Sequence, residues 1–134
     1  VLFRSRYKEN FNLLMTVPGL GLITSMSMLT ELDNDIMRFP NERSFVSMLG
    51  LIPTCHDSGD KKVNGEKINR GNKHLGPLIV EACWVAIQRD IELSAYYSNC
   101  CLSMKPHKAI IKVARKLACR AYAVLKTKTR YALP

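Results

Sequence analysis

Apolar side chains recur every three or four residues along most of the chain, which is the pattern of helices that bury one face. This recurrence predicts six helices, over residues 2–16, 22–32, 42–49, 72–89, 92–103 and 106–127. Proline, glycine and short Asp/Asn clusters interrupt the pattern between them. At 134 residues, of which 47% are hydrophobic, the chain is long enough for one domain with a real core. The predicted fold is all-α, a single compact helical domain over residues 1–134.

One long stretch, from Gly50 to Asn72, has no helical period. Long irregular segments inside compact domains are usually functional or disordered. Its Asn64-Gly65 pair is favoured in two-residue hairpin turns, so strands over 61–63 and 66–68 are predicted. The helical domain is therefore expected to contain one long loop that holds a small β-hairpin.

The sequence from Val17 to Gly21, Val-Pro-Gly-Leu-Gly between two apolar helices, has the form of a helix-hairpin-helix motif. In such a motif the glycines let the backbone approach a phosphate, and the free N–H groups at the start of the second helix bind it. Contacts of this kind set position on a duplex without reading bases. Gly19, Gly21 and Thr24 are the predicted binding residues. The alternative is an ordinary tight turn between packed helices.

The formal charge of +9 lies entirely in the C-terminal part of the chain. Through Glu92 the sequence holds 11 acids and 11 Lys or Arg residues; nine Lys or Arg residues and no acid follow. A basic block of this kind is typical of a surface that binds a polyanion, because neutralised phosphates release counterions. On the last predicted helix the cations on one face are Lys105, Lys108, Lys112, Lys116 and Arg120. The alternative is a solvated helix face that aids solubility.

No apolar run approaches the ~20 residues of a membrane span, and no signal peptide opens the chain, so a cytoplasmic protein without a membrane partner is expected. Five cysteines form no Cys-x-x-Cys pair, which argues against both a disulfide framework and a zinc site. No metal or other cofactor is expected in this chain. It opens at Val1 in what reads as the middle of a helix, which indicates a fragment of a longer protein.

The long loop carries one candidate nucleophile, Ser58, within His56-Asp57-Ser58-Gly59-Asp60. A serine hydroxyl is a weak nucleophile unless a base, a lowered pKa or a metal activates it. The same residues are also ordinary turn composition, so nucleophile and turn residue remain alternatives. The cations that would surround a phosphate at the loop and stabilise charge on it are Lys61, Lys62, Lys67, Arg70 and Lys73. Alternatively, these five cations simply belong to a solvated hairpin.

Six short motifs follow one another along nearly the whole chain. They are Val17-Pro18-Gly19-Leu20-Gly21, Arg38-Phe39, Leu49-Gly50-Leu51-Ile52-Pro53, Asp57-Ser58-Gly59, Ile68-Asn69-Arg70-Gly71-Asn72 and Ala114-Arg115-Lys116-Leu117. Each motif alone is weak, but their order resembles the C-terminal domain of the DEDD insertion-sequence transposases, the family numbered one hundred and ten.

The resemblance implies a role in DNA transposition. In that family an N-terminal RuvC-like domain holds magnesium with four carboxylates, and the C-terminal domain supplies a serine that attacks DNA and forms a phosphoserine link. Ser58 matches this serine, and Gly19 and Gly21 match the turn. Some members are guided by a structured RNA, and the active site is shared between protomers. The implied partners are therefore DNA, a guide RNA and a second copy, while the fragment alone is expected to be inactive.

Two positions depart from the family pattern. Asn69 stands where family members often have Ser or Thr, and Gly76 stands where they often have Arg. The second change removes a phosphate contact and disfavours a helix start at that point. Two other functions remain as alternatives: a non-catalytic helix-hairpin-helix module that tethers nucleic acid, and a protein-interaction domain whose basic face meets an acidic partner.

Overall fold

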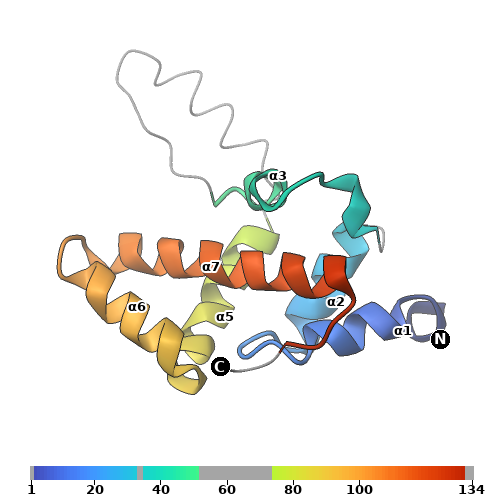
Figure 1. Ribbon diagram of the computed structural model, residues 1–134, viewed down its shortest axis with the longest axis horizontal. Helices are drawn as coiled ribbons and strands as arrows, with labels where there is room; N and C mark the ends of the chain where they lie inside the picture. The colour runs from blue at the N-terminus through green and yellow to red at the C-terminus, as the bar shows by residue number, and fades with distance from the viewer. Residues whose placement is uncertain (1, 33–34, 52–73, 132–134) are drawn as a thin grey trace, which may run out of the picture.

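The computed structural model describes residues 2–32, 35–51 and 74–131 (Figure 1). Every regular element in these ranges is a helix, which confirms the predicted all-α fold. The elements are α1 (Leu2–Leu14), α2 (Leu22–Leu32), the 3₁₀ helix η1 (Ile36–Arg38), α3 (Glu42–Met48), α5 (Leu75–Arg89), α6 (Ile91–Cys101) and α7 (Pro106–Thr127). The hairpin predicted over residues 61–68 lies outside the described residues.

Helix α7 is the centre of the fold and packs against α1, α3, α5, α6 and η1 (Figure 1). Its buried residues recur every three or four positions, as the sequence pattern predicts. Ala114, Ala118 and Ala121 are fully buried on this face, and their small side chains let neighbouring helices approach closely. The opposite face of α7 carries the cations.

Side chains at the helix starts fix where two of the helices begin. Asn41 is the predicted N-cap of α3, and its Oδ1 accepts a hydrogen bond of 2.9 Å from the Ser44 N–H. Asp90 caps α6 in the same way, accepting from the N–H groups of Glu92 at 2.9 Å and Leu93 at 3.4 Å. Pro106 occupies the first turn of α7, where a missing N–H costs nothing.

The turn between α1 and α2 depends on a glycine. Gly19 has a φ of +95°, which side-chain-bearing residues rarely adopt. A Cβ there would lie 2.6 Å from the Ala86 Cβ and 2.9 Å from the Ala82 carbonyl oxygen, both on α5. Gly19 is therefore required for the turn to pack against α5.

Helix α5 begins at Leu75, three residues later than predicted, and Gly76 lies inside it. Gly76 is buried, and a Cβ at this position would come 2.7 Å from the Leu49 carbonyl oxygen. The sequence departure at Gly76 is thus compatible with the helix start, and it lets the end of α3 contact the beginning of α5.

Candidate nucleic-acid interface

The predicted nucleophile and its cations belong to a segment that the structure does not describe. Ser58, Lys61, Lys62, Lys67, Arg70 and Lys73 all lie outside the described residues. The described flanks are buried: Leu51 donates its N–H to the Val46 carbonyl at 3.2 Å, and Leu75 is fully inaccessible. Because Gly76 contacts Leu49, both flanks are anchored in one core at neighbouring places.

The turn between α1 and α2 offers backbone groups to a partner. Gly21 is exposed, with no atom within 4 Å of the place where a Cβ would stand. The Ser25 N–H closes the first backbone hydrogen bond of α2, to the Gly21 carbonyl at 2.9 Å. The N–H groups before Ser25 therefore have no partner within the helix, which is the general property of a helix N-terminus.

The side chains at this turn differ from the sequence expectation. Thr24 is only 8% exposed, and its role in binding stays a prediction. The packing of Gly19 against α5 explains its missing side chain without any ligand. The outer surface of the turn is apolar, with Met15, Leu22 and Ile23 exposed. Only backbone groups at this turn are suited to a phosphate.

Helix α7 and its N-cap carry a row of basic residues. We define the α7 basic face by its members Lys105, Lys108, Lys112, Arg115 and Lys116. Lys108 and Lys116 are exposed and Lys112 is half-buried, and α7 contains no acidic residue. The Lys116 ammonium lies 4.6 Å from the ring centroid of Tyr96 on α6, a cation–π contact. The structure thus places the three predicted lysines along one side of one helix.

Arg120, which the spacing assigns to the same stripe, has a different role. Its guanidinium forms salt bridges with Asp90 and Glu92 at the start of α6, and its side chain is only 13% exposed. It also lies 5.2 Å above the ring of Tyr131. Arg120 is therefore a structural residue, and the accessible cations of the stripe end at Lys116.

Asp90 is ionised in this arrangement. Its burial alone would raise the pKa of the carboxyl, but the Arg120 guanidinium and the N–H groups of Leu93 and Glu92 outweigh burial and hold the pKa below its ordinary value. The carboxylate caps α6 and bonds α7 at the same time. Sequence reasoning missed this role, although an Asp directly before an apolar helical pattern is an N-cap signal.

The segment after α7, residues 128–131, folds back onto α1. Lys128 has a φ of +57°, and its ammonium donates to the Asn10 Oδ1 at 2.6 Å. The Tyr131 N–H donates to the Thr16 Oγ1 at 2.9 Å, and the Tyr131 hydroxyl lies 3.4 Å from Asp90 Oδ2. We call this segment the C-terminal tail; it ties α7 to the end of α1, and no periodicity predicts it.

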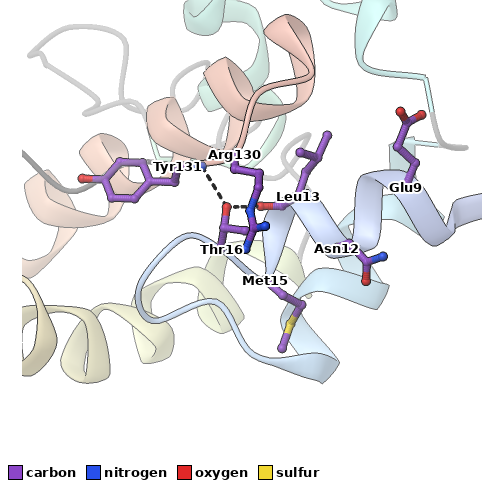
Figure 2. Close-up of a pocket in the computed structure, with 7 residues that line it drawn as sticks. All are labelled: Glu9, Asn12, Leu13, Met15, Thr16, Arg130 and Tyr131. Carbon is purple, nitrogen blue, oxygen red and sulfur yellow. Dashed lines mark hydrogen bonds between the residues drawn. The ribbon is translucent and has the colours of Figure 1, made fainter.

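The C-terminal tail and the end of α1 border an open groove of about 670 Å³ (Figure 2). In Figure 2 the carboxylate of Glu9 and the amide of Asn12 point in different directions. The Thr16 hydroxyl already donates to the Leu13 carbonyl at 2.6 Å and accepts from Tyr131. Small-molecule sites gather a few converging polar groups, and this groove does not.

Two negative findings apply to the described residues. No group of three or more His, Cys, Asp or Glu side chains among them could hold a metal ion. None of the helices that the structure describes is long and apolar enough to cross a membrane.

The chain was compared with protein families and known proteins. The family model described as "Transposase IS116/IS110/IS902 family" matches residues 11–98. The transposase for insertion sequence element IS1328 of Yersinia enterocolitica is 33% identical over 81 residues, which are 60% of this chain and 24% of that protein.

Two further relatives match the chain. The transposase for insertion sequence element IS1111A of Coxiella burnetii is 30% identical over 76 residues, 57% of this chain and 21% of the relative. The insertion element IS900 uncharacterized 42 kDa protein of Mycobacterium paratuberculosis is 24% identical over 129 residues, 96% of this chain and 32% of the relative. The aligned parts thus span only 21% to 32% of these relatives. No solved structure gives a significant match.

Proposed function

Because this chain belongs to the IS116/IS110/IS902 transposase family, we propose that it is the DNA-binding, serine-bearing domain of an insertion-sequence transposase. In this proposal it contributes to strand cleavage and transfer, together with a carboxylate-bearing domain that holds magnesium. The proposed partners are DNA, a guide RNA and a second protomer.

The α7 basic face is the observation that carries the DNA-binding part of the proposal. Four of its five cations lie on α7, which has no acid, and Lys105 is the N-cap of that helix. Arg120, the next cation of the stripe, is neutralised by Asp90 and Glu92. Each phosphate neutralised on B-DNA changes the slope of log K against log salt by about −0.9. Full engagement of this face predicts a slope of roughly −4 to −5.

The turn between α1 and α2 supplies the second proposed contact. Its exposed backbone at Gly21 and the positive end of the α2 dipole attract a phosphate without any basic side chain. Gly19 supports this contact indirectly, because it allows the turn to pack on α5. The interface is thus composed of side-chain cations on α7 and backbone N–H groups at α2.

Ser58 is the proposed nucleophile. Its hydroxyl oxygen attacks a DNA phosphorus, loses its proton to a base, and displaces the sugar oxygen of the broken P–O bond, which leaves a phosphoserine link. The proposed electrostatic support comes from the loop cations Lys61, Lys62, Lys67, Arg70 and Lys73. Magnesium held by the carboxylates of the other domain would supply further charge stabilisation of the phosphate. The support for this role is family membership and the motif order.

DNA binding is tested by fluorescence anisotropy of the purified chain with a labelled duplex and a labelled RNA of equal length, over a series of salt concentrations. We expect binding that weakens with salt along the slope given above, because the interface consists of phosphate contacts. The absence of DNA binding at low salt would contradict the proposal and favour an acidic protein partner for the basic face.

The nucleophile is tested by Ser58→Ala in the full-length transposase, with strand transfer and trapping of a covalent protein–DNA adduct as readouts. Strand transfer and the adduct should both be lost, because no oxygen remains to attack phosphorus. Ser98→Ala, at an exposed position of α6, is the matched control and should retain both. If DNA binds but wild type forms no adduct, the chain is a non-catalytic nucleic-acid-binding module.

A further inference from the structure

After Lys112, the cations of α7 lie on two different sides of the basic face. Residues three and four positions apart share a helix face, so Arg115 and Lys116 both follow Lys112 but on opposite sides of it. On one side, Lys116 lies toward α6 and forms the cation–π contact with Tyr96. On the other side, Arg115 is followed by Cys119, and Glu42 in the first turn of α3 acts on the pKa of the Cys119 thiol.

Arg115 and Arg120 differ in their partners. The guanidinium of Arg120 forms salt bridges with the carboxylates of Asp90 and Glu92. Arg115 is half-buried, and within the described ranges 2–32, 35–51 and 74–131 no salt bridge or hydrogen bond reaches its guanidinium. Among the described residues, none therefore satisfies its five N–H donors, which suit a ligand such as phosphate.

The charge of Arg115 acts on both sides of the α7 basic face. Burial, then Glu42, raises the pKa of the Cys119 thiol, and Arg115 opposes them. Burial and Cys100 likewise raise the pKa of the Tyr96 phenol on α6, again against Arg115. The positive charge of Arg115 therefore lowers the pKa of a group on the α6 side, Tyr96, and of one on the α3 side, Cys119.

We infer that Arg115 is the central DNA contact of the α7 basic face and binds one backbone phosphate with two parallel N–H···O bonds. A planar guanidinium matches two phosphate oxygens, which an ammonium cannot do. Arg115 is half-buried, and partial burial restricts a side chain before binding, which lowers the entropy lost on contact. Lys108, Lys112 and Lys116 then contact neighbouring phosphates. This inference rests on the DNA-binding function proposed above.

The test compares Arg115→Ala, Arg115→Lys and wild type by fluorescence anisotropy on one labelled duplex, over a series of salt concentrations. Arg115→Ala should weaken binding about tenfold or more and reduce the salt slope by about 0.9, the value for one lost phosphate contact. Arg115→Lys should have the salt slope of wild type but an affinity between those of Arg115→Ala and wild type. The lysine keeps the positive charge but cannot form two parallel hydrogen bonds to one phosphate.

Arg89→Ala is the matched control. It removes the same charge from an exposed position in the last turn of α5, outside the α7 basic face, and should change affinity by less than about twofold. Circular dichroism melting of each variant establishes that the helices are intact.

Three results would overturn the inference. In the first, a folded Arg115→Ala variant keeps the affinity and salt slope of wild type while Lys112→Ala lowers both. This result would contradict the role of Arg115 and would still agree with the proposed DNA-binding function. Another is an Arg115→Lys variant with full affinity, which contradicts the two-bond contact even if Arg115→Ala does not fold. Wild-type chain that binds RNA but not the duplex would overturn the DNA contact and the proposed function together.

Discussion

At the scale of single residues, the two glycines of the α1–α2 turn have different physical roles. Gly19 has a positive φ and contacts α5 so closely that a methyl group would overlap Ala86. Gly21 has open space around it. A motif with two glycines therefore contains one residue that close packing against α5 requires and one whose open surroundings suit close approach by a ligand.

Gly19→Ala is expected to destabilise the chain by about 3 kcal/mol, from backbone strain at positive φ together with overpacking against α5. Gly21→Ala should change the free energy of unfolding by less than about 1 kcal/mol, since a Cβ there meets nothing. Urea denaturation followed by circular dichroism measures both. Equal effects of the two substitutions would show that the close contact with Ala82 and Ala86 does not determine the role of Gly19.

At the scale of elements, the helices follow from the sequence because burial on one face repeats with the helical period. The predicted ends of α2 and α7 and the N-cap Asn41 agree with the structure. The start of α5 lies at Leu75, three residues after the predicted start. Local pattern fixes where a helix exists, while its first residue also depends on side-chain caps such as Asn41 and Asp90.

The candidate interface was predictable only in part, because some of its contacts join residues far apart in the sequence. Spacing places Lys108, Lys112 and Lys116 on one face of α7, and the structure agrees. Spacing cannot tell that Arg120 meets Asp90, because the two are 30 residues apart in sequence. Nor can it tell that Thr24 is buried, since that depends on which face of α2 packs inward. Roles that depend on distant contacts were the ones missed.

At the scale of the whole molecule, one buried carboxylate joins three parts of the chain. Asp90 caps α6, pairs with Arg120 of α7, and lies 3.4 Å from the hydroxyl of Tyr131 in the C-terminal tail. The tail in turn bonds Thr16, two residues after the end of α1. The contacts of Asp90 therefore support the packing of α6, α7 and the tail that borders the α1–α2 turn.

Asp90→Asn should lower the free energy of unfolding at pH 7 by about 3 kcal/mol, because Arg120 loses its buried partner while an Asn can still cap α6. The carboxyl pKa is lower in the folded state than in the unfolded state. Its contribution is therefore complete above the unfolded pKa of about 3.9 and is lost as pH falls through the folded pKa. Urea denaturation at pH 7 and at a series of acidic pH values measures this contribution.

The control for Asp90 is its neighbour in the same ion-pair cluster. Glu92 is 56% exposed, so Glu92→Gln should cost less than about 1 kcal/mol, because solvent screens its pairing with Arg120. In Asp90→Asn the loss of stability between pH 4 and lower pH should be smaller than in wild type, since the titrating group is gone. An unchanged acid dependence, or equal costs for the two substitutions, would contradict the view that the buried Asp90–Arg120 pair holds α6, α7 and the C-terminal tail together.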